Sequence, residues 1–490
     1  MQKNFHRNHF ISILILALLF VSACGGTTTE QLQEAASSNQ EDEVIEAQDE
    51  SESQEGQIEA ENSETEKNPT EISATNTPEP TEPSPTATSA PTEPPPTSTP
   101  EPEPITIVSQ GFGQNDRSIG YSFLIKNPNV GLAFEDSQYQ LAALDESGAI
   151  VDTDSGFIAL LLPEQKLGIG GTLFVDEGVT VSSIQIQLNA GSPQATESIP
   201  NFTVELPTYV SGDFFSYVNG IIQSPYNRDF SNIRVSTIVY NAEDEIIGGG
   251  YTYVNFILAN ESTGVSVSVE SNGEVARAEL YPVLSGLSLF QENNDLPENT
   301  EPLSLINEGF GQDERSAGYG FLIENPNIGH TIENSQYRIT FYSADGTVLE
   351  TDEGYINIIL PEQELGIGGE IFLDESQVID SIETQIIAGN YIETSEELPQ
   401  LTSENVTYSQ GSFSSQVTGF IASPYSQDIT NLLVSAILFD ENGNIIGGGY
   451  TYLDFAAANS NSAVEVSVTT NGVPESVELY ALPTSLSDFE

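Results

Sequence analysis

An internal duplication constrains the fold of this chain more than any other feature of its sequence. The register between the two halves is 198 or 199 residues and runs through almost all of both. A repeat of this length predicts two copies of one folding unit, here called copy 1 and copy 2. The polar segment between them, about Ser285 to Pro302, is predicted to be a linker. The clearest matches pair Gly111–Gln114 with Gly309–Gln312, Phe123–Asn129 with Phe321–Asn327, Leu167–Gly171 with Leu365–Gly369, and Gly248–Tyr253 with Gly447–Tyr452.

Each copy has the sequence pattern of β-strands. In one typical run Val235, Thr237 and Val239 alternate with their neighbours and share one face of the expected strand. Turn pairs such as Asp345-Gly346 and Asn442-Gly443 separate the runs. The predicted fold class is therefore all-β, with tandem Ig-like β-sandwich modules after a disordered N-terminal spacer. The four predicted modules are 1a (105–200), 1b (201–290), 2a (303–400) and 2b (401–490).

The N-terminus has the pattern of an export signal. Lys3 and Arg7 precede an apolar run, Ile11–Phe20, which is too short to span a bilayer as a stable helix. The small residues Val21–Ala23 then lead directly to Cys24. This arrangement resembles the lipobox of bacterial lipoproteins, which implies cleavage after a signal peptide of residues 1–23 and lipidation of Cys24. The expected location is outside the cytoplasm, anchored by lipid to the cell membrane.

Residues 24–104 are predicted to be a lipidated, disordered spacer. They are rich in Pro, Thr, Glu and Ser and contain too few apolar residues to offset the entropy of ordering. The whole chain has a formal net charge of −63, which argues against a nucleic-acid partner. Cys24 is the only cysteine, so no intramolecular disulfide is possible.

The second module of each copy resembles the FxLYD domain of bacterial exported proteins. The resemblance rests on Val434–Gly443 followed by Ile445–Gly447, on Val417–Ile421 upstream, and on Val218–Ile222 and Ile238–Asn241 in copy 1. Asn241 and the pair Ala422-Ser423 depart from the family pattern. The first modules are also reminiscent of the LEA type 2 domain, through Asn127–Asn129 and Asn325–Asn327. These resemblances cover about half of the exported part and imply an Ig-like fold with no known catalytic activity.

The sequence offers little material for catalysis. His6 and His9 fall in the expected signal peptide, which leaves His330, and the matching residue in copy 1 is Leu132. A histidine-based triad or a histidine-ligated zinc site therefore lacks its groups within one chain. The common nucleotide-binding, hydrolase and metalloprotease motifs are absent. We predict that the protein is not an enzyme and needs no cofactor, with Ca²⁺ as the one ion considered below.

Calcium is considered because carboxylates alternate at matching places in the two copies. Asp152 and Asp154 in copy 1 correspond to Glu350 and Asp352 in copy 2, and hard oxygen ligands suit Ca²⁺. The remainder of an EF-hand loop is missing, so a solvated strand end or turn is the alternative interpretation.

Two further sets of side chains are candidates for ligand binding. Tyr251 and Tyr253, with Tyr450 and Tyr452 in copy 2, lie two residues apart and so share a sheet face, where exposed rings could stack on a sugar. The alternative is that they line the core or edge of the sandwich, beside glycines that allow a bulge. Arg117 and Arg315 follow the Gly-Phe-Gly-Gln motifs. Each either clamps its own loop to a carboxylate or carbonyl, or captures an anionic ligand.

These observations favour a surface-exposed, lipid-anchored protein that displays Ig-like domains for adhesion or for protein or glycan interaction. The expected partners are the membrane, through the lipid anchor, and a cell-wall glycan or an envelope protein. Two alternatives remain open at this point: a structural or accessory subunit of a cell-envelope complex, and a calcium-stabilised surface protein.

Overall fold

The computed structural model describes residues 102–196, 199–212, 215–289, 296–394, 398–411 and 414–487. The predicted signal peptide, Cys24 and the spacer up to residue 101 lie outside these described residues. Among the residues that are described, no helix has both the length and the apolar character needed to span a membrane.

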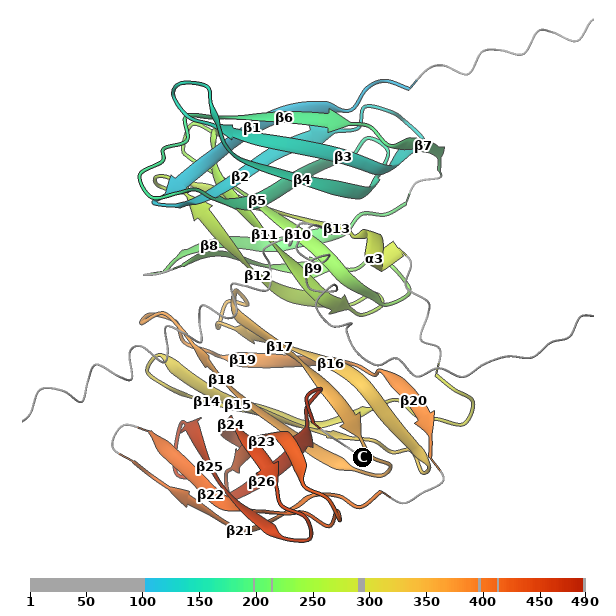
Figure 1. Ribbon diagram of the computed structural model, residues 1–490, viewed down its shortest axis with the longest axis vertical. Helices are drawn as coiled ribbons and strands as arrows, with labels where there is room; N and C mark the ends of the chain where they lie inside the picture. The colour runs from blue at the N-terminus through green and yellow to red at the C-terminus, as the bar shows by residue number, and fades with distance from the viewer. Residues whose placement is uncertain are drawn as a thin grey trace, which may run out of the picture. The chain divides into compact units, whose positions relative to one another are not determined.

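Module 1a is a sandwich of two antiparallel sheets (Figure 1). Its strands are β1 (Thr106–Asn115), β2 (Ser118–Lys126), β3 (Leu132–Leu144), β4 (Ile150–Leu161), β5 (Lys166–Phe174), β6 (Ser183–Asn189) and β7 (Ser192–Ala195). The inner sheet has the order β1-β2-β5, and the outer sheet has the order β4-β3-β6 with β7 also paired to β3. Alternate residues of each strand fill the space between the sheets, where Tyr121, Phe123 and Leu141 are buried.

Module 1b is a single six-stranded sheet that closes over its own core. Its strands are β8 (Thr203–Ser211), β9 (Ser216–Gln223), β10 (Phe230–Tyr240), β11 (Ile246–Ile257), β12 (Ser262–Ser271) and β13 (Arg277–Leu284), followed by the short helix α3 (Gly286–Leu289). The strand order is β13-β10-β11-β12-β9-β8. Only two residue pairs, Gly248–Ser271 and Gly249–Glu270, join β11 to β12. The sheet turns sharply there and encloses Val218, Val235 and Val267.

Copy 2 repeats this architecture strand for strand. Module 2a has the sheets β14-β15-β18 and β17-β16-β19, with β20 paired to β16, and module 2b has the order β21-β22-β25-β24-β23-β26. The all-β sandwich fold predicted from the sequence is confirmed. The strand bounds are β14 (Ser304–Asp313), β15 (Ser316–Glu324), β16 (His330–Tyr342), β17 (Val348–Ile359), β18 (Glu364–Phe372), β19 (Ser381–Ile387), β20 (Asn390–Glu393), β21 (Thr402–Ser409), β22 (Ser415–Ala422), β23 (Ile429–Phe439), β24 (Ile445–Ala456), β25 (Asn461–Thr470) and β26 (Ser476–Pro483).

Glycines let the two modules of each copy pack backbone against backbone. The inner sheet of module 1a lies on β10 and β11, and a Cβ atom added to Gly170 would come within 2.3 Å of the Gly250 carbonyl oxygen. A Cβ on Gly249 would lie 1.8 Å from Ser122 Oγ. One register shift does occur beside these glycines, between Val239 and Tyr240 of β10. The recurring glycine motifs therefore serve close sheet packing as well as the expected bulge.

The Asn-Pro-Asn motifs fix the start of each copy. Asn127 is buried, and its Nδ2 donates hydrogen bonds to the carbonyl oxygens of Leu132 and Leu162 at 2.8 and 2.9 Å. Asn129 Oδ1 accepts a hydrogen bond from the backbone N–H of Glu103 at 2.8 Å, and Asn129 Nδ2 donates to the Glu103 carbonyl oxygen. Asn325, Asn327 and Glu301 repeat these bonds in copy 2, so the amides satisfy backbone groups that strands leave unpaired.

Candidate functional site

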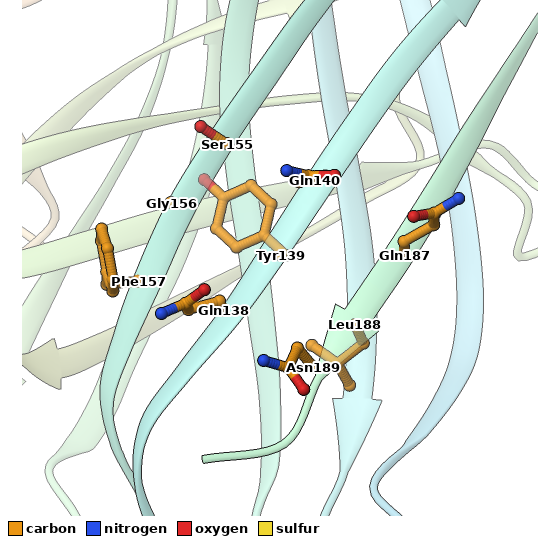
Figure 2. A pocket seen from close by; sticks show the side chains of 9 residues that line it. All are labelled: Gln138, Tyr139, Gln140, Ser155, Gly156, Phe157, Gln187, Leu188 and Asn189. Atoms are coloured by element: carbon orange, nitrogen blue, oxygen red, sulfur yellow. The ribbon is translucent and has the colours of Figure 1, made fainter.

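The outer sheet of module 1a presents a polar face to solvent. Because side chains alternate along a strand, Gln138 and Gln140 of β3 point outward while Tyr139 and Leu141 point inward. The register places Phe157 and Asn189 on either side of Gln138, and Ser155 and Gln187 on either side of Gln140. These side chains surround a depression of about 340 Å³ (Figure 2), which is lined by Gln138, Tyr139, Gln140, Ser155, Gly156, Phe157, Gln187, Leu188 and Asn189. We call these nine residues the amide face.

The amide face carries no charged side chain, although the chain contains 74 Asp and Glu residues. Its amides each offer both donors and acceptors, which suits a neutral ligand with hydroxyl or peptide groups. Phe157 is 72% exposed and adds an apolar ring at one side of the depression. The amide face is thus an uncharged region of an acidic chain.

A buried tyrosine lies beneath the amide face. Tyr139 Oη is 3.5 Å from Tyr121 Oη, and the Tyr121 hydroxyl donates a hydrogen bond to Asp154. Burial raises the pKa of both tyrosines, so both hydroxyls stay neutral at physiological pH. A Cβ on Gly156 would lie 2.6 Å from Tyr139 Oη, which explains why a glycine occupies the floor of the depression.

The carboxylates considered for calcium have other partners. Asp154 and, in copy 2, Asp352 accept hydrogen bonds from buried tyrosines; Tyr319 Oη is 2.5 Å from Asp352 Oδ2. Asp152 accepts a hydrogen bond from the backbone N–H of Thr153 at 2.8 Å. Within the described ranges, no group of three or more His, Cys, Asp and Glu residues is placed to hold a metal ion. Asp152 and Asp154 lie within β4, and Glu350 and Asp352 lie within β17, so these carboxylates belong to strands and not to turns.

Copy 1 covers part of the homologous face of copy 2, around Arg338 and Gln385, whereas Tyr355, which matches Phe157, stays 61% exposed. Strands β9 and β12 of module 1b pack on β16 and β17 of module 2a, and we call this contact the copy interface. Arg338, which replaces Gln140, is only 3% exposed; its Nε donates to the Gly264 carbonyl oxygen at 3.0 Å and its Nη1 pairs with Glu353. Gln385, which matches Gln187, donates to the Ser262 carbonyl oxygen at 2.8 Å.

Copy 1 contributes its own polar anchor to the copy interface. Asn219 of β9 is 1% exposed, and its Nδ2 donates to the carbonyl oxygens of Val348 and Leu349 at 3.1 and 2.8 Å. Gly264 leaves room for Thr340, since a Cβ on the glycine would be 2.2 Å from Thr340 Cγ2. The copies are therefore joined by polar contacts and close packing together.

Burial at the copy interface changes the ionisation of its charged groups. It raises the pKa of the Glu350 carboxyl to about 6, against an ordinary value of 4.5. It also raises the pKa of Asp352 and of Glu353, and it lowers the pKa of Arg338. The Arg338–Glu353 pair partly compensates this desolvation.

The four predicted tyrosines form two matching pairs on β11 and β24. The ring centroids of Tyr251 and Tyr253 are 5.9 Å apart at nearly a right angle, and those of Tyr450 and Tyr452 repeat this geometry. All four rings are partly exposed and do not fill the core of the sandwich, although β11 and β24 are interior strands of their sheets. The Arg234 guanidinium lies 4.5 Å from the Tyr251 ring centroid, and Leu433 replaces that arginine in copy 2.

The two predicted arginines clamp the loops in which they lie. Arg117 Nε donates to the Val175 carbonyl oxygen at 3.0 Å, and Arg315 Nε donates to the Leu373 carbonyl oxygen at 3.0 Å. Arg315 also lies within 4.0 Å of carboxylate oxygens of Asp374 and Glu375. The clamp is the first of the two interpretations that the sequence allowed. The structure does not bring either arginine together with the tyrosine pairs as a single site.

Sequence reasoning missed the amide face and Arg338. The duplication places Gln140 and Arg338 at matching positions, each directly after a shared Ser-Gln-Tyr. Several other residues of these two strands also differ between the copies, so this one change does not by itself mark the site.

Comparisons with known proteins do not assign this chain to a family. No family model matches, and no curated protein matches. Solved structures with a partial likeness include two of Escherichia coli alpha-2-macroglobulin and one named pT26-6p, all with a TM-score of 0.11. The native macroglobulin is 9% identical, and the match covers 75% of this chain and 28% of the macroglobulin. The elastase-activated form is 11% identical, with 78% of this chain and 44% of the macroglobulin covered. The protein named pT26-6p is 7% identical, with 76% of this chain and 66% of pT26-6p covered. A TM-score of 0.11 does not indicate a shared fold.

Proposed function

We propose that this chain is an exported, lipid-anchored protein that displays its sandwich modules for adhesion or for protein or glycan interaction, without catalysis. The observation that carries the proposal is the amide face: an exposed, hollowed and uncharged sheet face on an otherwise acidic molecule. Surface faces of this kind, with amides around an aromatic ring, fit recognition of neutral polar groups.

The duplication supports a binding role for this face. In copy 2 the homologous face already binds a protein surface, that of β9 and β12 in the same chain. The outer sheet of copy 2 thus packs against another part of the same chain, and the matching outer sheet of copy 1 is exposed. Gln140 in place of Arg338 removes a charge that a partner covering this face would have to desolvate.

The position at the cell surface is inferred from residues outside the described part. Cys24 follows a lipobox-like sequence, and acyl chains on that residue would hold the protein at the membrane.

A non-catalytic role agrees with the chemistry of the amide face. Tyr139 is its only titratable side chain, and burial raises the pKa of that hydroxyl. A general acid or base working near neutral pH needs a pKa in that range. The groups at this face are therefore suited to binding and not to proton transfer.

The proposal is tested by capture experiments with the purified full chain on cell-wall glycans and on envelope extracts. Gln140→Glu places one negative charge in the centre of the amide face, and we expect it to abolish capture. Gln194→Glu makes the same change on β7, at an exposed position outside the amide face, and should leave capture intact. Capture that is unaffected by Gln140→Glu would move the site elsewhere, and failure of the unmodified chain to capture any envelope component would refute a binding function.

A further inference from the structure

We infer that the amide face is a docking site for a second copy of this chain, which binds through the outer face of β22 and β25. This inference rests on the proposed binding function and names the partner of the same face. The contact would reproduce, between two molecules, the copy interface that already joins modules 1b and 2a within one molecule. The two end faces of the chain are the homologues of the two faces that meet in its middle.

The homology of these faces can be followed residue by residue. Asn219 and Gly264, buried in the copy interface, correspond to Thr418 and Ala463, which are exposed on β22 and β25. Arg338, on the opposite side of that interface, corresponds to Gln140 on the amide face. Each molecule therefore carries two uncovered faces, the amide face and the outer face of β22 and β25. The homologues of these two faces pack together in the copy interface.

Side-chain sizes at the two end faces are complementary. In the copy interface the smallest residue, Gly264, faces Thr340, and no larger residue would fit. At the end faces Ala463 replaces the glycine and Ala142 replaces the threonine. An exchange of Gly with Thr for Ala with Ala keeps the joint volume nearly constant, as a packed contact requires. The pair would thus fit between molecules in the place where Gly264 and Thr340 fit within one.

Apolar side chains are exposed at both end faces. Ile150 is 63% exposed, whereas its homologue Val348 in the copy interface is 1% exposed. Phe420 on β22 is 39% exposed, and its homologue Ile221 is more buried. Covering the large apolar groups at both ends would remove their surface from water, which is the main favourable term in protein association.

Two polar contacts of the copy interface can be repeated between molecules, whereas the approach of Ser266 to Glu350 becomes one of Glu465 to Asp152, two carboxylates. Gln385 donates to the Ser262 carbonyl oxygen, and Gln187 retains the same amide opposite the homologous carbonyl of Asn461. Gln140 offers a neutral donor to the Ala463 carbonyl in the place of Arg338, without a charge to bury. Since the donor face and the acceptor face differ, the contact leaves one free face at each end and produces open rows of molecules.

A disulfide trap tests this contact. All chains are full length and carry Cys24→Ser, so that each has one introduced thiol. Ile150→Cys is mixed with Thr418→Cys, because the homologous Val348 and Asn219 are in contact, with Val348 O 3.1 Å from Asn219 Nδ2. Seated thiols meet at a high effective concentration, so we expect about tenfold more linked dimer from the mixture than from either chain alone.

Two controls make the trap decisive. Gln194→Cys, an exposed thiol on β7 outside the amide face, replaces Ile150→Cys and should give only the background yield. Equal yields from Gln194→Cys and Ile150→Cys would overturn the inference, since chance collisions would then explain the linkage. Gln140→Glu added to the Ile150→Cys chain should reduce the linked dimer to background, and an unchanged yield would likewise overturn it.

The outcomes also separate this inference from the proposed function. Absence of the specific linked dimer, together with envelope capture that Gln140→Glu abolishes, would show that the face binds something other than a second copy. In sedimentation, assembly should increase with salt, because screening reduces repulsion between chains of net charge −63. Assembly that weakens steadily with salt would point to attraction between opposite charges and contradict the apolar and amide contact proposed.

Discussion

The outer sheets of modules 1a and 2a have the same strands in the same register but different surroundings. In module 2a the central position of the face is Arg338, buried and paired with Glu353 beneath copy 1. In module 1a the matching positions are Gln140 and Ser155, both exposed. A charged pair is therefore kept where the chain covers it with matching polar groups, and neutral side chains occupy the face that solvent reaches.

The largest difference between the two faces should appear on truncation of their central residues. Arg338→Ala removes the ion pair with Glu353, whose side chain is 34% exposed, and the buried hydrogen bond to the Gly264 carbonyl oxygen, so we expect a loss of about 1.5–3 kcal/mol in the free energy of unfolding. Gln140→Ala removes an exposed amide and should change stability by less than about 0.5 kcal/mol. Chemical denaturation of both variants measures this. Equal losses would mean that the copies are not held together as described.

A second test concerns the glycines, which both copies share. Gly448→Ala would place a Cβ 2.1 Å from the Tyr319 carbonyl oxygen, where neither backbone can yield, and overpacking of this kind costs about 1–3 kcal/mol or more. The matched control is Gly472→Ala in the same module, where a Cβ would meet nothing within 4 Å. Thermal unfolding should show a lowered midpoint for the first variant alone. A midpoint that is not lowered by Gly448→Ala, or is raised equally in both variants through the smaller entropy of the unfolded chain, would contradict the packing role of the glycines.

The third test is the pH dependence of the copy interface. The folded chain holds the pKa of Glu350 at about 6, above its ordinary value of 4.5, so the folded state binds this proton more tightly than the unfolded state. Stability from this group is fully present below pH 4.5 and is lost as the pH rises through 6, a change of at most about 2 kcal/mol. Asp352 and Glu353, whose pKa values are also raised by burial, act in the same direction.

The matched pair for this test is Glu350→Gln and Asp152→Asn, which occupy the same position in the two copies. Glu350→Gln should reduce the fall in stability between pH 4.5 and 7, and Asp352 and Glu353 should account for the part that remains. Asp152→Asn, on the uncovered copy, should leave the whole fall in place. Denaturant titrations at a series of pH values give the slopes, and a slope that Glu350→Gln leaves unchanged would assign the effect to other groups.

The sequence was sufficient for the fold class because the strands alternate clearly and every element occurs twice. It was also sufficient to select Arg117, Arg315 and the four tyrosines as unusual, and it left two interpretations for each. It could not show that β9 and β12 cover module 2a, because packing between copies depends on side chains such as Asn219 and Gly264 that look ordinary in a strand. The amide face was missed for the same reason: glutamines on a strand become notable only when three strands align them.

The smallest expected effect concerns the arginine clamps, which the two copies share. Arg117→Ala and Arg315→Ala each remove one hydrogen bond to a backbone carbonyl, worth about 1 kcal/mol. The weaker contacts of Arg315 with Asp374 and Glu375 are exposed and add less than about 1 kcal/mol. Both variants should therefore lower the unfolding midpoint slightly and to a similar extent, and leave envelope capture and the Ile150–Thr418 linkage unchanged. Unchanged melting combined with lost capture would instead assign ligand binding to these loops and not to the amide face.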